Sequence, residues 1–319
     1  MGSNRIVVLT ALQLEAKAVR KLLPDLTRHN LSTGTIVQEV ALPGTGYNIC
    51  LVCTGPGNGQ AAVIAERVIN WADPAAVLFV GIAGGLKHDI ALGDIVAATQ
   101  VDDYRGGKDA VGGFKARPKA WVAAHLLVQV AQYVEATQRW TKFLPEGDRP
   151  VPNVHFKPIA SGDVVKDTSD SPLAMLLDTS YNDAAAIEME AAGVAEAAQH
   201  RRVDFLVVRG ISDRSDGNKS SSDGGWQERA AQHAAAFAIG VITELPDPVP
   251  AGRPGPAQDS AVKSGEVAEP DWSLLGQAVN VSWRTDLQRP YGTETSALEL
   301  HLVPVGAGAR LQVLRLQAL

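Results

Sequence analysis

The 319-residue chain lacks several features that would place it outside ordinary globular proteins. No apolar run reaches the roughly 18–20 residues that a membrane-spanning helix needs. The apolar run 6–12 is too short for the core of a secretory signal and is typical of a strand. The formal net charge of −6 excludes a global basic field for nucleic acid or anionic membranes. We therefore expect a cytoplasmic protein that binds no membrane and is unlikely to bind nucleic acid.

Cysteine is also scarce, since Cys50 and Cys53 are the only two. Their Cys-x-x-Cys spacing could serve metal or redox chemistry. It lies inside the apolar run 49–54, however, and residues three apart on a strand point to opposite faces. The sequence offers no second pair to complete a zinc site. We therefore predict two buried strand cysteines, with no metal and no cofactor.

Up to residue 245, stretches typical of strands alternate with stretches typical of helices. The expected strands are 5–10, 47–54, 76–80, 94–99, 155–160 and 205–209. The expected helices are 11–23, 60–71, 121–137, 191–200 and 227–244. Alternation at this length predicts an α/β fold with a mixed, mainly parallel central sheet flanked by helices.

The composition changes after residue 245. Segment 246–270 has six prolines and three glycines with almost no large apolar residue, so we predict a linker there. Segment 271–319 has alternating runs typical of a small β-containing module, too short for more than a marginal core. It ends inside an apolar run, and we expect it to be incomplete or to need a protein partner. The predicted domains are 1–245, which carries the chemistry, the linker 246–270 and the module 271–319.

Polar or glycine-rich segments follow several of the expected strands. They are residues 10–15, 54–59, 81–85, 161–163 and 210–213. Ligands of open α/β sheets bind at the carboxyl ends of the strands. We therefore expect these segments to meet at one edge of the sheet and to form the functional site.

These segments belong to an ordered series of motifs. The series is TALQLEA (10–16), TGPGNGQAA (54–62), GIAGGL (81–86), GDIV (93–96), SGD (161–163), EMEAA (188–192) and VVRGISD (207–213). Each motif alone is weak, but the order resembles the nucleoside phosphorylase superfamily over about residues 5–244. Within it, the chain looks like the methylthioadenosine/S-adenosylhomocysteine nucleosidases. The resemblance implies a nucleoside phosphorylase-like fold, a small-molecule purine nucleoside or nucleotide as ligand, and a homo-oligomer such as a homodimer.

The chemistry of this family explains the carboxylates. Cleavage of a purine N-glycosidic bond requires protonation of the leaving base and deprotonation of a water on the opposite face of the sugar. The resemblance implies that Asp213 protonates N7 of the purine and that Glu15 deprotonates the water. It further implies that Glu190 binds the ribose hydroxyls, that Met189 packs on the sugar and that Ser212 orients Asp213.

Structural roles are open for the same residues. Glu15 could stabilise a helix start, where the dipole favours a carboxylate, and Asp213 could cap a turn. One of Glu188 and Glu190 could be solvated surface. The glycines at 84 and 85 could be turn residues, although the resemblance places Ala83 and Gly84 against the substrate.

The nucleophile also has two readings, water or phosphate. A phosphorylase holds phosphate beneath the ribose, usually with arginines and a glycine loop. Here the first strand leads to Glu15, and no arginine occurs in the following stretch before Arg20. Because a carboxylate would repel phosphate, we predict that water is the nucleophile and that the enzyme is a purine nucleosidase, with a purine nucleoside phosphorylase as an alternative.

The chain departs from the small nucleosidases after its SGD motif. The family usually places an aromatic residue there, which stacks on the base. This chain has Val164, Val165 and Lys166 instead. We expect these three residues to contact the base, with Lys166 as a polar contact.

A basic stretch lies between the fourth expected strand and Trp121. It contains Arg105, Lys108, Lys115 and Arg117. Methylthioadenosine needs no such cations, whereas a 5′-phosphate does. The stretch resembles effector domains of bacterial antiviral systems, some of which cleave ATP to adenine and ribose 5′-triphosphate. The alternative is a solvated loop whose neighbouring aspartates offset the basic residues.

Three functions are therefore open. The favoured one is hydrolysis of a 5′-phosphorylated adenine nucleotide such as ATP, releasing adenine as an effector in bacterial defence. The alternative is a methylthioadenosine/S-adenosylhomocysteine nucleosidase with an unrelated appendage. The third is a nucleoside sensor without catalysis, against which the combination of Glu15, Glu190 and Asp213 argues.

Overall fold

The structure, a computed structural model, describes residues 4–111, 113–164, 166, 168, 170–215 and 223–247. Val165 lies outside these residues, as do the expected linker from residue 248 onward and the whole expected module 271–319. The described part therefore covers most of the predicted domain 1–245, and the fold and the site are built from it.

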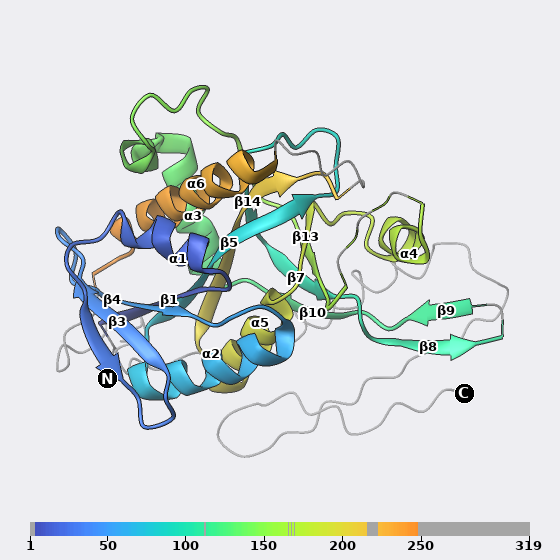
Figure 1. Cartoon of the computed structure of the whole chain (residues 1–319), viewed down its shortest axis with the longest axis horizontal. Helices are drawn as coiled ribbons and strands as arrows, with labels where there is room; N and C mark the ends of the chain where they lie inside the picture. The colour runs from blue at the N-terminus through green and yellow to red at the C-terminus, as the bar shows by residue number, and fades with distance from the viewer. Residues whose placement is uncertain are drawn as a thin grey trace, which may run out of the picture. The chain divides into compact units, whose positions relative to one another are not determined.

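Four neighbouring parallel strands form the centre of the sheet (Figure 1). In spatial order they are β4 (Asn48–Cys53), β1 (Arg5–Thr10), β5 (Ala76–Gly85) and β14 (Asp204–Asp213). Their sequences are nearly continuous apolar runs, as burial on both faces requires. Because parallel strands end at the same edge, the segments that follow them in the sequence lie close together.

Shorter strands extend this centre. Beyond β4 lie β3 (Ile36–Ala41) and β2 (Thr27–Asn30), and β14 also pairs with β6 (Ile95–Ala98), which pairs with β11 (Val154–His155). The end of β5 pairs with β13 (Ala186–Glu188), followed by β12 (Ile159–Ser161), β7 (Gln100–Asp103) and β10 (Lys119–Val122). Within the described residues, these twelve strands form one mixed sheet. A separate hairpin consists of β8 (Gly107–Ala110) and β9 (Gly113–Ala116).

Helices cover both faces of the sheet (Figure 1). One face packs on α2 (Asn58–Ala72) and α5 (Ala191–Arg201) through residues such as Val7 and Phe79. The other packs on α1 (Gln13–Arg20), α3 (His125–Thr137) and α6 (Asp223–Thr243) through residues such as Val8 and Leu78. Successive strand residues point to opposite faces, so each central strand contributes to both cores. The expected α/β fold with a mixed sheet flanked by helices is confirmed.

Two further short helices complete the described elements. They are α4 (Pro172–Ser180), which packs with Tyr104 in a small third core, and the 3-10 helix η1 (Arg139–Phe143). No helix of the described residues is long and apolar enough to cross a membrane.

Several expected boundaries were wrong. The expected helix 121–137 begins only at His125, because Trp121 and Val122 belong to β10 and pair with β7. The expected strand 155–160 is two short strands on either side of Pro158, which has no N–H for a ladder. Of the two cysteines, Cys50 is buried as predicted, and burial raises the pKa of its thiol to about 12. Cys53 is only partly buried, at the open end of β4.

Candidate active site

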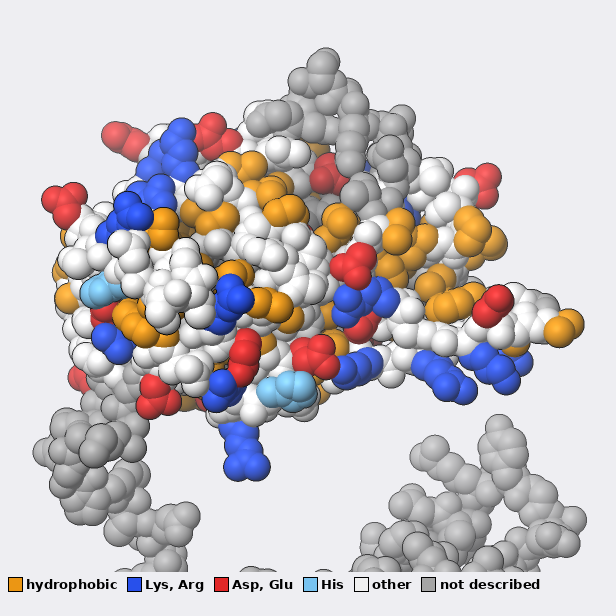
Figure 2. Space-filling view, turned by 60° about the horizontal axis from the view of Figure 1, so that its bottom comes forward, with side chains coloured by type: hydrophobic (Ala, Val, Ile, Leu, Met, Phe, Trp, Pro, Cys, Tyr) orange, Lys and Arg blue, Asp and Glu red, His pale blue; other side chains and the backbone are white. Residues whose placement is uncertain are grey.

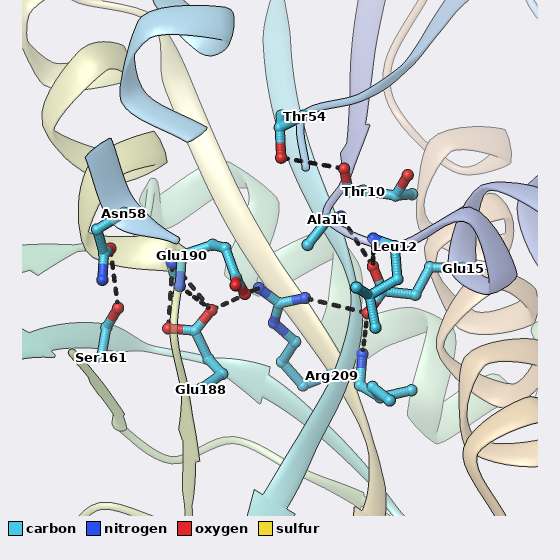
Figure 3. A network of polar contacts seen from close by, with 12 residues as sticks. Thr10, Ala11, Leu12, Glu15, Thr54, Asn58, Ser161, Glu188, Glu190 and Arg209 are labelled. Atoms are coloured by element: carbon cyan, nitrogen blue, oxygen red, sulfur yellow. Dashed lines mark hydrogen bonds and ion pairs between the residues drawn. The ribbon is translucent and has the colours of Figure 1, made fainter. Parts of the chain in front are cut away.

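The segments that follow β1, β4, β5 and β14 meet at the carboxyl edge of the sheet. Figure 3 shows the carboxylates of Glu15, Glu188 and Glu190 converging on one guanidinium, that of Arg209. Glu15 follows β1, whereas Glu188 ends β13 (Ala186–Glu188) and Glu190 precedes α5. We call Glu15, Glu188, Glu190 and Arg209 the arginine cluster. No group of three or more His, Cys, Asp or Glu side chains suited to a metal occurs among the described residues.

Glu15 lies in the first turn of α1 and is almost fully buried. Its Oε2 accepts hydrogen bonds from the backbone N–H groups of Ala11 and Leu12, both at 2.8 Å, and its Oε1 accepts one from Ile82 N–H at 2.9 Å. Burial raises the pKa of Glu15, against the opposing effects of Arg209 and these N–H donors. The carboxylate thus stabilises the helix start and is also a desolvated base.

Arg209 projects from the middle of β14 and is completely buried. Its Nη2 donates to Glu188 Oε2 at 2.5 Å. Its Nη1 lies 3.9 Å from Glu15 Oε1, and its Nη2 lies 3.9 Å from Glu190 Oε2. The guanidinium also lies 4.0 Å from the centre of the Phe79 ring. One cation therefore serves three carboxylates from two segments, the one that follows β1 and the EMEAA motif.

The glycine at position 81 makes this arrangement possible. A Cβ at Gly81 would overlap both Arg209 Nη1 and Glu15 Oε1. The GIAGGL motif thus begins with a residue whose missing side chain leaves room for the cluster.

Glu188 and Glu190 are both buried, so the interpretation of one of them as solvated surface was wrong. Glu188 accepts from the backbone N–H groups of Glu190 and Ala191 at the start of α5, at 2.9–3.1 Å. Glu190 Oε1 accepts from Gly57 N–H at 2.9 Å, in the glycine loop after β4. Burial raises the pKa of Glu190, and the neighbouring Glu188 raises it further.

Asp213 ends β14, the strand that also carries Arg209. The register against β5 shifts between Ile211 and Asp213, and such a bulge re-aims a side chain. Ser212 Oγ donates to Asp213 Oδ2 at 3.0 Å. The Ser215 N–H and Oγ donate to Asp213 Oδ1 at 3.0 and 3.2 Å. We call Asp213, Ser212 and Ser215 the aspartate site.

The other predicted contacts lie around these two groups. Ala83 and Gly84 are buried at the end of β5, and a Cβ at Gly84 would overlap Ser215 Oγ. Met189 lies between Glu188 and Glu190 and is half-buried. Val164 is 57 % exposed, and Lys166 donates through Nζ to the backbone carbonyl of Ser215 at 2.6 Å.

The structure does not gather the four predicted phosphate-binding cations into one cluster. Arg105 is held by two carboxylates, Asp103 at 2.8 Å and Asp163 at 2.9 Å, which raise its pKa. Lys108 and Lys115 face each other across the β8–β9 hairpin, and Arg117 follows it. Figure 2 shows Lys and Arg side chains along this projecting hairpin, at the right of the view.

Asn58 connects the glycine loop to the region around Arg105. Its Nδ2 donates to Asp163 Oδ1 at 3.0 Å, while its Oδ1 accepts from Ser161 Oγ and from Gly193 N–H. Arg105 is therefore part of a network that joins the SGD loop to the starts of α2 and α5.

Comparison with known proteins agrees with this architecture. The sequence model of the phosphorylase superfamily matches residues 5–243 of the chain. The chain belongs to this superfamily. The predicted resemblance to the nucleoside phosphorylase superfamily is thereby confirmed.

Similar proteins within the superfamily include nucleosidases. The 5′-methylthioadenosine/S-adenosylhomocysteine nucleosidase of Haemophilus influenzae strain 86-028NP is 26 % identical over 245 residues, covering 76 % of this chain and 99 % of the relative. The nucleosidase of the same description from Helicobacter pylori has a solved structure with a TM-score of 0.66 and 23 % identity, covering 77 % of this chain and 100 % of that one. The futalosine hydrolase of Helicobacter pylori strain 26695 has a TM-score of 0.65 and 23 % identity, covering 76 % and 98 %.

Sequence reasoning missed Arg209, the central residue of the arginine cluster. A signal was present, because Arg209 is the only charged residue inside the apolar run 205–212. A charge in a buried strand is retained only with a partner. That rule would have pointed to the nearby motifs that carry Glu15, Glu188 and Glu190.

Proposed function

We propose that the chain hydrolyses the N-glycosidic bond of an adenine nucleoside and releases adenine. The observation that carries the proposal is the carboxylate of Glu15, buried beside Arg209 and held by three backbone N–H groups. A desolvated carboxylate of raised pKa is suited to deprotonate a water.

The same observation favours hydrolysis over phosphorolysis. The N–H groups at the start of a helix form a ready site for phosphate. Here the N–H groups of Ala11 and Leu12 are already bonded to Glu15 Oε2. A phosphate at this edge would have to replace that carboxylate or lie against its negative charge. Water meets neither obstacle.

The remaining groups supply the other parts of the reaction. Glu190 would accept from ribose hydroxyls through Oε2, the oxygen that faces Arg209. Within the described residues, Arg209 Nη1 has no hydrogen-bond partner, and it can donate to the water or the sugar between Glu15 and Glu190. Asp213, when protonated, delivers its proton to the departing purine. The purine thereby leaves as a neutral base as its bond to C1′ breaks. The oxygen of the water forms the new bond to C1′, and Glu15 takes the water proton.

The first candidate substrate is a nucleoside without a 5′-phosphate. The Haemophilus influenzae and Helicobacter pylori relatives are described as acting on 5′-methylthioadenosine and S-adenosylhomocysteine. In this chain Arg105, the predicted phosphate ligand nearest to the SGD loop, is already neutralised by Asp103 and Asp163. A 5′-phosphate would have to compete with both carboxylates for it.

A nucleoside 5′-phosphate such as ATP is the second candidate, on one specific observation. Lys108 and Lys115 are direct cross-strand neighbours, and like charges in that position destabilise a hairpin. Neither lysine forms an ion pair with another described residue. A bound polyphosphate would relieve their repulsion, and with this substrate the effector role in bacterial defence stays a prediction.

The test is chromatography of reactions with methylthioadenosine, adenosine, AMP and ATP, with and without added phosphate. We expect free adenine, a sugar that keeps its 5′ substituent and has a free hydroxyl rather than a phosphate at C1′, and no acceleration by phosphate. The double variant Lys108→Ala/Lys115→Ala separates the two substrate classes. If the double variant loses activity on ATP alone, the second candidate is supported. If it cleaves every substrate at the wild-type rate, the first candidate is supported. A 1-phosphorylated sugar, or no adenine from any nucleoside, would refute the proposal.

A further inference from the structure

Ser215 holds Asp213 more tightly than a turn residue needs to. It donates twice to the same carboxylate oxygen, through its N–H at 3.0 Å and its Oγ at 3.2 Å. Ser215 is buried and has a φ of +51°, a left-handed conformation that non-glycine residues rarely adopt. Such local strain persists where surrounding contacts fix it.

Two contacts fix it here. Lys166 Nζ donates to the Ser215 carbonyl at 2.6 Å, from the segment between β12 and α4. Gly84 lies directly beneath the Ser215 hydroxyl, and a Cβ at that position would overlap Oγ. The hydroxyl therefore has a prepared place, and Lys166 links it to a different part of the sheet edge.

The chain shortly before Lys166 is anchored at Gly162 and Val164. The Tyr104 hydroxyl donates to the Val164 carbonyl at 2.9 Å, and the Tyr104 ring packs against Gly162. Tyr104 is 4 % exposed, so this anchor belongs to the core. Lys166 thus connects Ser215 to the part of the chain that follows β12 and contacts Tyr104.

We infer that Ser215 and Lys166 are positioning residues for the general acid Asp213, an inference that rests on the proposed function. Each carboxylate oxygen has two acceptor sites, so a proton can occupy the one that Ser212 and Ser215 leave free. As Asp213 gives this proton to the purine, negative charge develops on its oxygens. Donors already aimed at those oxygens stabilise that charge as it forms. Lys166 keeps the Ser215 donors aimed.

The test measures kcat and KM for adenine release from methylthioadenosine by the full chain. Ser215→Ala and Ser215→Gly both remove the hydroxyl, while Gly tolerates the left-handed backbone. We expect kcat to fall about tenfold or more in both, as loss of a charge-assisted hydrogen bond predicts, with KM changed less than about twofold. Ser180→Ala, an exposed serine at the end of α4, is the matched control and should keep both constants.

Lys166 is tested by rescue. Lys166→Met should lower kcat, and Lys166→Arg should restore most of it, because arginine keeps a donor for the Ser215 carbonyl. In Ser215→Gly, where the backbone needs no help, Lys166→Met should have little further effect. Lys157→Met, which removes a surface ion pair with Asp89, serves as the control.

The outcomes separate this inference from the proposed function. If the wild-type chain releases adenine and Ser215→Ala keeps the wild-type kcat, the positioning role is overturned and the function stands. If kcat and KM worsen equally, or Lys166→Arg fails to restore activity lost in Lys166→Met, the two residues are merely structural. If the wild type releases no adenine from any nucleoside, the function fails, and the role of the pair fails with it.

Discussion

The arginine cluster and the aspartate site face the same edge of the sheet, but they are built differently. In the cluster, backbone N–H groups from four segments and one guanidinium hold three buried carboxylates. In the aspartate site, two serines hold a single, partly exposed carboxylate. The difference follows from desolvation, because a deeply buried charge requires many fixed partners, whereas a partly solvated one requires few.

Substitutions in the arginine cluster and in the aspartate site should therefore have different effects on stability and on catalysis. The cluster carboxylates close helix starts and neutralise Arg209, so the groups proposed for catalysis also have a structural role. Among the residues that the structure describes, the aspartate site closes no helix and neutralises no buried charge. Changes in the cluster should therefore alter stability, and changes in the aspartate site should alter catalysis alone.

The largest effect is expected for Asp213→Asn, which breaks catalysis and keeps the fold. The amide cannot protonate the base, and general-acid catalysis contributes roughly 10²–10⁴-fold. We expect kcat to fall by at least the lower figure. The Ser212 and Ser215 hydroxyls can turn to accept from the new amide, so the free energy of unfolding should change by less than about 0.5 kcal/mol.

Asp178→Asn on the exposed face of α4 is the matched control for both measurements. Wild-type turnover in Asp213→Asn would remove Asp213 from the mechanism. A large loss of stability would show that the aspartate site is structural after all and would end the contrast with the cluster.

Arg209→Met tests the other half of the comparison. Methionine fills most of the space but leaves Glu188 buried without its cation, and breaking a buried pair on one side costs about 3–5 kcal/mol. We expect urea denaturation to show a loss of this size. Arg214→Met is the control, because the single hydrogen bond of the Arg214 side chain to another described residue is a 3.3 Å contact with the Lys87 carbonyl. A loss below about 1 kcal/mol would mean that the cluster is not what holds this edge together.

The sequence predicted the elements whose signal is local. The central strands β1, β4, β5 and β14 are apolar runs followed by polar motifs, and each was expected to start within one residue of its observed start. The expected ends of β5 and β14 were wrong, because these strands continue to Gly85 and Asp213. β2 was missed, since its sequence TRHN is polar and mostly exposed. β13 was missed because three residues carry no periodicity.

The candidate site was predictable to the same extent. The family motifs pointed to Glu15, Glu190 and Asp213, and the structure places their segments at one edge of the sheet. The pairing of Arg105 with Asp163, 58 positions away, depends on which strands become neighbours. No local pattern contains that information, and the predicted cluster of four cations therefore took no account of the carboxylates that hold Arg105.

The pH dependence of the cluster should separate activity from stability. Burial raises the pKa of Glu15 and Glu190 above the ordinary 4.5. Below 4.5, folded and unfolded chains both bind these protons, and the stabilisation is fully present. As the pH rises through the raised values, the folded chain must give up protons it binds more tightly, and this contribution to stability is lost. Over the same window Glu15 becomes an active base.

We therefore expect kcat/KM to rise with pH in a limb whose midpoint lies above 4.5, while the free energy of unfolding contributed by the cluster falls. Glu190→Gln should flatten that fall, because it removes one of the titrating groups. The lowered pKa values of Asp103, Asp148 and Asp163 act below the ordinary aspartate range and do not enter this window. An acidic limb centred at or below 4.5 would contradict the assignment of Glu15 as the base.

The smallest effect is expected for Val164→Phe, which adds an aromatic ring near the aspartate site. Val164 is 57 % exposed where the family usually has an aromatic residue, and its backbone is fixed by the Tyr104 hydroxyl. Stacking on a base contributes about 1–3 kcal/mol. At an exposed position the lower figure applies, which corresponds to about a fivefold lower KM. Because ground state and transition state gain equally, kcat should stay within about twofold.

Val122→Phe, at an exposed apolar position on β10, should change neither constant. An unchanged KM in Val164→Phe would show that the base lies elsewhere, and an equal gain in both variants would show that added apolar surface, rather than stacking, is responsible.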